Sequence, residues 1–313
     1  MNETHSRRKF LKTMAMVPLI TSIGPYSFFS ATQTAGSPFS YKFKISLNAY
    51  SFNSPLLDGK MTLFDVLDFC ARYNFDAIDP TGYYFQGYPN VPSDEYINSF
   101  KRKAFQLGLD ISGTGVRNDF TIPDPQKRKA DIEMIKMWIK ASAKMGAPNL
   151  RIFGGTSNHE GFSRDQVFEW MTKDISECCE YGEKFGVMIA IQNHNDFFQT
   201  ADDIERIFKM VDSEWLGLNL DIGSYRQKDP FLEIEQSVKY AVTCQIKENV
   251  WIEGKETPTD FVRLFSIMKK GGYRGYLPLE TLGDGDPLEK VPNLLENVQK
   301  ALQQIENNET TKP

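Results

Sequence analysis

The sequence is poor in histidine, with only three among its 313 residues: His5, His159 and His194. Protein sites that bind several zinc ions are built largely from histidine and cysteine ligands. The small number of histidines therefore argues against a multi-zinc nuclease.

Cysteine is also scarce, and its spacing matches no known framework. The four cysteines form no CxxC pair; they are Cys70, Cys178, Cys179 and Cys244. Even in an oxidising compartment, this spacing does not indicate a disulfide scaffold. We expect all four side chains to act as small fillers of the core or the surface.

The N-terminal 35 residues have the features of a twin-arginine export signal. Residues 6–12 read SRRKFLK, and residues 13–31 are mostly apolar or small and carry no charge. A membrane anchor is the alternative, but Pro18, Gly24 and Pro25 make the stretch weakly apolar for a permanent span. We therefore predict a signal over residues 1–35, a periplasmic or otherwise exported protein, and no stable membrane insertion after export.

The rest of the chain lacks an excess of positive charge. Residues 1–35 contain four basic residues and one acid, so removing their net +3 changes the formal charge from −5 to −8. An acidic domain is poorly suited to binding phosphodiester backbones. We therefore expect no nucleic-acid partner and instead a small neutral or cationic ligand.

Short β-rich runs alternate with helical stretches from residue 43 onwards. The eight runs cover residues 43–50, 76–79, 110–115, 149–154, 187–193, 216–221, 241–247 and 275–280. Capping residues typical of helix starts precede several of the stretches between them, at Thr62, Ser93, Ser163 and Thr200. Glycines that favour helix ends come shortly before the next run, at Gly108, Gly146, Gly186 and Gly272.

Eight such alternations without a long Pro/Gly/Ser linker predict a single (β/α)8 TIM barrel over residues 36–313. A doubly wound open sheet is the alternative. It is less favoured because no run is followed by a G-x-G-x-x-G turn. In a barrel, functional groups are expected at the C-terminal ends of the strands.

Polar side chains end or follow the last four runs of this predicted barrel. They are Gln192 and His194, Asp221, Gln245 and Lys247, and Glu280. Two carboxylates brought together need a shared proton or a cation, and a hard divalent ion suits carboxylate and amide oxygens. The pattern therefore indicates a binding site, and the alternative is a set of strand-end groups that are merely solvated.

The sequence resembles the sugar phosphate isomerase/epimerase proteins with a xylose-isomerase-like barrel. The resemblance is carried by the segments IAIQNHNDF, LGLNLDIGSY, CQIKEN and YRGYLPLETLG, and by the order of helices and strands from residue 43 to about residue 307. Each segment is short, so their order and spacing carry most of the weight.

The resemblance implies a divalent metal held by Glu, Asp, His and Glu from strands five to eight. The matching positions here are Gln192, Asp221, Gln245 and Glu280, so two of the four depart from the pattern. The expected ion is Mn²⁺ or Mg²⁺, with Zn²⁺ or Co²⁺ as further options. Because Gln192 cannot take up a proton, Glu280 is left as the candidate base and a symmetric two-base reaction is in doubt.

A second proton carrier would come from His194, Lys247, His159 or Glu160. For His194 a catalytic or substrate-contact role and a structural hydrogen bond are equally open. Lys247 matches a lysine often found in the family, and pairing with Asp221 or Glu280 is as good an interpretation as catalysis.

Loops after the strands offer contacts for a saccharide. Aromatic faces stack on sugar C–H surfaces, and polar side chains bind hydroxyl groups, although aromatic residues also fill protein cores and loops are often merely solvated. The candidates for substrate binding are Tyr50, Tyr84, Arg117, Asn118, His159 and Trp251.

The first functional hypothesis is a metal-dependent isomerase or epimerase, or a related lyase or hydratase. It would act on an unphosphorylated sugar, keto-sugar or glycoside by removing a proton next to a carbonyl. The second is a non-catalytic carbohydrate-binding protein on a degenerate barrel, favoured by the loss of Glu at position 192. A barrel endonuclease is disfavoured by the few histidines and the acidic charge. The oligomeric state, including a homo-oligomer, stays open.

Overall fold

The structure is a computed structural model that describes residues 43–156 and 160–310. The predicted export signal and His159 lie outside the described residues.

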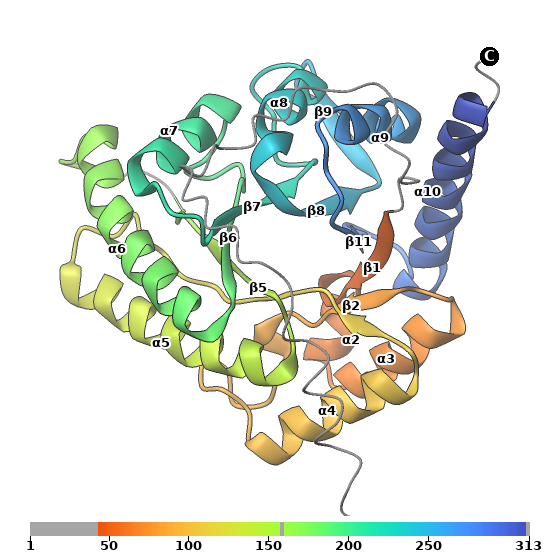
Figure 1. The fold of residues 1–313 in the computed structure, drawn as a ribbon, viewed down its shortest axis with the longest axis horizontal. Helices are drawn as coiled ribbons and strands as arrows, with labels where there is room; N and C mark the ends of the chain where they lie inside the picture. Colours follow the sequence, from red (N-terminus) through yellow and green to blue (C-terminus); the bar gives the residue numbers. More distant parts are fainter. Residues whose placement is uncertain (1–42, 157–159, 311–313) are drawn as a thin grey trace, which may run out of the picture. The chain divides into compact units, whose positions relative to one another are not determined.

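The described strands include a nine-stranded parallel sheet that curls into a barrel (Figure 1). Its order is β3-β2-β1-β11-β8-β7-β6-β5-β4. The strands are β1 (Lys44–Asn48), β2 (Ala77–Asp79), β3 (Asp110–Ile111), β4 (Thr114–Gly115), β5 (Asn149–Phe153), β6 (Met188–Gln192), β7 (Leu216–Asp221), β8 (Ala241–Lys247) and β11 (Tyr276–Glu280). The end strands β3 and β4 are two pieces of a single predicted run, so the sheet nearly closes on itself. The predicted (β/α)8 TIM barrel is therefore confirmed.

Helices surround the sheet on its outer side (Figure 1). They are α2 (Asn53–Leu57), α3 (Leu63–Arg72), α4 (Asp94–Gln106), α5 (Pro125–Met145), α6 (Arg164–Phe185), α7 (Ala201–Val211), α8 (Pro230–Ser237), α9 (Phe261–Lys270) and α10 (Pro287–Thr310). Short 3₁₀ turns follow some of the strands and helices, at η1 (Ala49–Phe52), η2 (Gly82–Tyr84) and η3 (Val238–Tyr240).

The helix ends follow the local signals in the sequence. The side chains of Thr62, Ser163 and Thr200 each accept a backbone N–H in a capping box, which satisfies donors that the first helical turn leaves open. Gly146 and Gly186 end α5 and α6 with φ of 90° and 66°, a conformation that costs glycine little. These predicted boundaries are confirmed.

Apolar side chains fill the layer between helices and strands. Trp138 of α5 and Phe168 of α6 are fully buried there, together with the side chains of Ile152 and Ile191 that point outward from their strands. All four cysteines are buried as free thiols. The expectation that they are fillers agrees with this placement.

The inward-facing side chains of the strands are largely polar, because neighbouring residues of a strand point to opposite sides of the sheet. The strand register places Gln192 beside Asn219, Asp221 beside Gln245, and Glu280 beside Lys247. Because all these strands are parallel, these polar ends meet at one end of the barrel.

A two-stranded antiparallel hairpin follows β8 and was not predicted. It consists of β9 (Asn249–Ile252) and β10 (Lys255–Pro258), joined by Glu253 and Gly254, which both have positive φ. Two positive φ values suit the tight turns that join hairpin strands. The turn lacks the Asn-Gly or Asp-Gly pair that would have marked the hairpin in the sequence.

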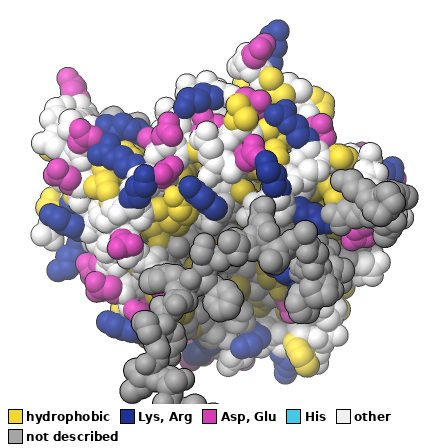
Figure 2. Space-filling view, turned by 45° about the horizontal axis from the view of Figure 1, so that its top comes forward, with side chains coloured by type: hydrophobic (Ala, Val, Ile, Leu, Met, Phe, Trp, Pro, Cys, Tyr) yellow, Lys and Arg dark blue, Asp and Glu magenta, His cyan; other side chains and the backbone are white. Residues whose placement is uncertain are grey.

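The described residues contain no helix with the length and apolar character needed to cross a bilayer. On the face shown in Figure 2, lysine and arginine side chains are interspersed with aspartate and glutamate.

Candidate functional site

A pocket with about 940 Å³ of empty space, open to solvent, lies at the C-terminal ends of the strands. Its floor and walls combine the predicted strand-end residues with groups from the loops that follow. Those from the strand ends and the segment just after β6 are Asn48, Arg151, Phe153, Gln192, His194, Asp221, Gln245, Lys247 and Glu280. The barrel topology therefore brings all six predicted strand-end groups to one place.

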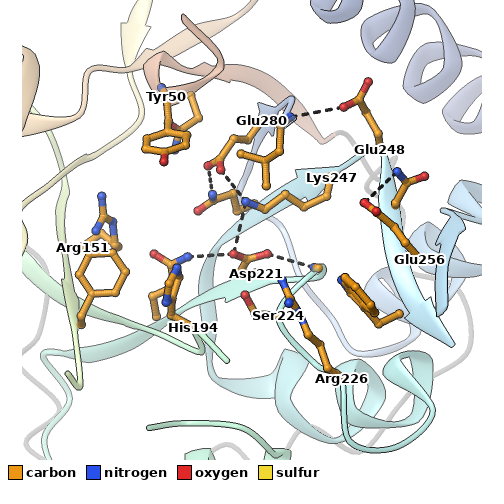
Figure 3. Close-up of a pocket in the computed structure, with 18 of the residues that line it drawn as sticks. Tyr50, Arg151, His194, Asp221, Ser224, Arg226, Lys247, Glu248, Glu256 and Glu280 are labelled. Atoms are coloured by element: carbon orange, nitrogen blue, oxygen red, sulfur yellow. Dashed lines mark hydrogen bonds and ion pairs between the residues drawn. The ribbon is translucent and has the colours of Figure 1, made fainter. Parts of the chain in front are cut away.

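A lysine joins the two carboxylates at the floor of this pocket (Figure 3). The Nζ atom of Lys247 lies 2.5 Å from Oε1 of Glu280 and 3.4 Å from Oδ2 of Asp221. The three residues are 7%, 5% and 2% exposed, respectively. Such a buried arrangement compensates two negative charges with one positive charge, which limits the cost of removing them from water.

The two glutamine side chains bind the same carboxylates. Nε2 of Gln192 donates to Oδ2 of Asp221 over 2.9 Å, and Nε2 of Gln245 donates to Oε2 of Glu280. On its other side, Oε1 of Gln245 accepts a hydrogen bond from Nδ2 of Asn219 at 3.1 Å. Asn219 was not singled out in the sequence because it is part of an apolar-looking run, and only the folded sheet brings its side chain to that of Gln245.

Burial and charge shift the pKa values of the central pair. Burial by itself lowers the pKa of Lys247, but the charges of Asp221 and Glu280 raise it more, so it lies above the ordinary lysine value. Burial raises the pKa of Glu280 above that of an ordinary glutamate, although Lys247 opposes this. Lys247 is therefore charged at neutral pH, and Glu280 is a stronger base than an exposed glutamate.

The donor set does not fit the divalent ion that the family resemblance implies. Both amides turn their N–H groups, not their oxygens, toward the carboxylates, and the ammonium group of Lys247 lies between the two acids. The polar groups at the pocket floor are therefore arranged to satisfy an ammonium group and not to ligate a divalent ion.

His194 lies at the rim of the pocket, beyond the end of β6. Its Nδ1 atom lies 2.6 Å from Oδ2 of Asp196, and its ring makes a T-shaped contact with that of Phe153, with 5.0 Å between the ring centroids. About 45% of its side chain is exposed. An imidazole held on one side by a carboxylate and open on the other can contact a ligand or exchange protons with solvent.

Arg151 and Asp79 form a part of the barrel interior that the sequence analysis missed. The Arg151 guanidinium lies 4.3 Å from the ring of Phe153, and Nη2 donates to the hydroxyl of Tyr83 at 3.4 Å. Burial raises the pKa of Asp79 to about 6, with the charge of Arg151 opposing and that of Glu280 adding to the effect. The sequence analysis treated both residues only as members of strand runs. The signal that could have revealed them is a charged residue within a run, at a position that points into the barrel.

Trp251, one of the predicted substrate contacts, lines the pocket from the β9–β10 hairpin. The guanidinium of Arg226, in the loop after β7, lies 4.5 Å from the centre of its ring. This stack holds the indole ring beside the pocket and adds a cation–π attraction. Tyr50 and Arg117, two further predicted contacts, also line the pocket.

The structure places two other predicted contacts outside the residues that line this pocket. The hydroxyl of Tyr84 donates to Asn53 at 2.6 Å, and the neighbouring Tyr83 lines the pocket instead. The buried amide of Asn118 bonds to the backbone O and N–H of Phe153 at 2.8 and 2.9 Å. Adjacent residues of a short turn face different directions, and the sequence does not specify which of them faces the pocket.

The barrel and its polar pocket define the class of protein. A family model described as a xylose isomerase-like TIM barrel matches residues 67–306. Since this match covers well over half of the chain, the protein belongs to the xylose isomerase-like TIM barrel family. A sequence comparison with the curated proteins finds no match.

Solved structures with the same fold include sugar epimerases. The 3-keto-D-glucoside 4-epimerase from E. coli is 13% identical, with a TM-score of 0.67 over 83% of this chain and 100% of that chain. The D-psicose 3-epimerase from Clostridium cellulolyticum H10, solved with D-tagatose, is 17% identical, with a TM-score of 0.67 over 85% of this chain and 99% of that one. A Bacillus anthracis protein described as "the probable 3-DHS dehydratase" is 17% identical, with a TM-score of 0.62 over 83% and 99%. At these identities the likeness shows the fold.

Proposed function

We propose that this protein is an isomerase or epimerase that removes a proton from the carbon next to a carbonyl group of a small carbohydrate. The observation that carries the proposal is the buried base Glu280, paired with the ammonium of Lys247 at the floor of an open polar pocket. The fold, shared with sugar epimerases, supports the choice of substrate class.

In the proposed step, the carboxylate of Glu280 takes the proton from carbon. The electron pair of the broken C–H bond moves toward the carbonyl oxygen, giving an enediolate. A hydrogen bond from Lys247 to that oxygen stabilises the developing negative charge. Return of this proton by Glu280 to the neighbouring carbon, while Lys247 passes the hydroxyl proton between the two oxygens, gives an isomer. An epimer requires a second group that protonates the opposite face of the same carbon, for which His194 and Lys247 are the candidates. Elimination requires the same donor to protonate the departing β-substituent.

The substrate that we propose is an unphosphorylated sugar, keto-sugar or glycoside. The lining combines hydrogen-bonding groups such as Asn48 and Asn249 with the aromatic rings of Tyr50 and Trp251, which suits a polyhydroxylated ring.

We also propose that residues 1–35 direct the protein out of the cytoplasm. Outside the cytoplasm, unphosphorylated substrates are expected. Mass spectrometry of the protein secreted by its host would test this, and an unprocessed cytoplasmic chain would contradict it.

A direct test is to incubate the purified protein in D₂O with unphosphorylated ketoses, 3-keto-glycosides and inososes, and to follow the carbon next to the carbonyl by NMR. We expect deuterium incorporation with at least one of these compounds, even where no net conversion occurs. The matched control is Glu280→Gln, which keeps the shape of the side chain but cannot accept a proton. Equal exchange in the variant would refute the role of Glu280.

A non-catalytic carbohydrate-binding protein is the second candidate. It is favoured by Gln192, an amide where the resembled family has a glutamate, since this removes one proton acceptor from the site. Calorimetric binding of one of the same compounds, together with no exchange by the wild-type protein, would establish this second function instead of the first.

A further inference from the structure

We propose that Lys247 is a built-in cation that replaces the divalent ion implied by the family resemblance, so that the site works without a metal. In this arrangement its ammonium group compensates part of the negative charge of Asp221 and Glu280 and binds the carbonyl oxygen of the substrate. The charge compensation stands on the geometry of the site, and the catalytic part rests on the proposed function.

The position of the ammonium group is the first support for this proposal. Two buried carboxylates brought together need either a shared proton or a positive charge, and Nζ of Lys247 supplies the charge from β8. Figure 3 shows Lys247 reaching across the pocket floor between Glu280 and Asp221. A metal ion that used both carboxylates would have to displace this ammonium group first.

The orientation of the amides is the second support. Gln245 accepts a hydrogen bond from Asn219 through Oε1 and donates one to Glu280 through Nε2. Turning its oxygen toward an ion would set its own N–H₂ against the N–H₂ of Asn219, two donors facing each other. Asn219 is thus a positioning residue that keeps Gln245 in the orientation suited to a carboxylate and unsuited to a metal.

The oxygen atoms of Asp221 are also engaged. Oδ1 accepts the backbone N–H of Gly223 at 3.0 Å, and Oδ2 accepts from Gln192 at 2.9 Å. The amide of Gln192 donates a hydrogen bond to Asp221, whereas an ionised glutamate at the same position could only accept one. The resembled family has Glu and His where this chain has Gln192 and Gln245. One lysine cannot satisfy both carboxylates, and the two amides supply the further N–H donors that Asp221 and Glu280 accept. The two glutamines are therefore compatible with an ammonium group at this place.

One donor of Lys247 is available for a ligand. An ammonium group has three N–H bonds, and the structure directs two toward Glu280 and Asp221. Lys247 also lines the pocket. A carbonyl or enediolate oxygen placed above the pair can accept the third hydrogen bond, which is the electrostatic role that a divalent cation would otherwise have.

The test is a titration with Mn²⁺, followed by calorimetry and by electron paramagnetic resonance, without any substrate. We expect the EDTA-dialysed wild-type protein to bind Mn²⁺ no more tightly than its Glu280→Gln variant. We expect Lys247→Met to bind it at least about a hundredfold more tightly than wild type, because the ion no longer has to displace a positive charge. The matched control is Lys290→Met, which removes a lysine paired with Glu248 at 3.2 Å beside the same pocket and should leave Mn²⁺ binding unchanged.

Two results would overturn the proposal. One is wild-type protein that is purified with about one equivalent of metal, or that binds Mn²⁺ tightly and loses it on Glu280→Gln. The other is folded Lys247→Met protein with no gain in affinity. The wild-type titration decides the matter even where Lys247→Met fails to fold, and it does not depend on catalysis. The catalytic part predicts deuterium exchange in EDTA-dialysed wild-type protein, and exchange that requires added metal would refute it.

Discussion

Substituting Asp79 by asparagine should change how the stability of the barrel depends on pH. Asp79 is 7% exposed at the end of β2, and burial raises its pKa from 3.8 to about 6. The folded protein therefore binds this proton more tightly than the unfolded chain does. The resulting stabilisation is complete below about pH 4 and is lost as the pH rises through about 6.

The size of the effect follows from the two pKa values. At about 1.4 kcal/mol per pKa unit, the difference between 3.8 and about 6 amounts to about 3 kcal/mol of unfolding free energy. Asparagine cannot ionise, so the Asp79→Asn variant avoids this loss. Relative to wild type, its unfolding free energy should rise by up to about 3 kcal/mol between about pH 4 and about pH 7.

The assay is urea unfolding followed by tryptophan fluorescence at a series of pH values for both proteins. Subtracting the wild-type curve removes the contribution of the other titrating groups, which the two proteins share. The control is Asp284→Asn, the same substitution at an exposed position, where no buried carboxyl group is removed. A difference between Asp79→Asn and wild type that does not change with pH would refute the reasoning from burial.

Three further substitutions test the site and the packing. Glu280→Gln should lower kcat of the proposed exchange by about 10²- to 10⁴-fold with far-UV circular dichroism unchanged; undiminished exchange rules out Glu280 as the base. Trp251→Ala should raise KM or the ligand Kd about tenfold and change kcat less, because it removes a stacking surface away from the reacting carbon; an equal loss in kcat would argue against a binding role. Gly182→Ala should cost about 1–3 kcal/mol in urea unfolding, since the added Cβ would overlap the backbone oxygen of Val187; wild-type stability would contradict this packing.

The order of elements could be predicted because its signals are local. Thr62, Ser163 and Thr200 cap helices through atoms three residues away, and Gly146 and Gly186 end helices through their own φ angles. The run at residues 110–115 was predicted as one strand, whereas the structure breaks it into β3 and β4. The β9–β10 hairpin was missed because Glu253-Gly254 carries a weak turn signal.

The candidate site was predictable to the level of its strands and no further. The C-terminal ends of parallel strands lie at the same edge of a sheet, so Gln192, Asp221, Gln245 and Glu280 had to approach one another once the barrel was assumed. Their roles as metal ligands stay a prediction from resemblance, and the orientation of the two amides and the position of Lys247 argue against it. The spacing of residues in the sequence does not show that Tyr83 lines the pocket and Tyr84 does not. It also does not show that Arg151 lines the pocket.

The sequence by itself thus determined the alternation of strands and helices, the barrel and the set of polar groups at its mouth. These depend on side-chain periodicity and on interactions between near neighbours in the chain. Only the tertiary structure decided that Lys247 lies between Asp221 and Glu280 and that Asn219 orients Gln245. Hydrogen-bond direction and charge compensation depend on which atoms face each other across strands, and that is set by the register of the closed sheet.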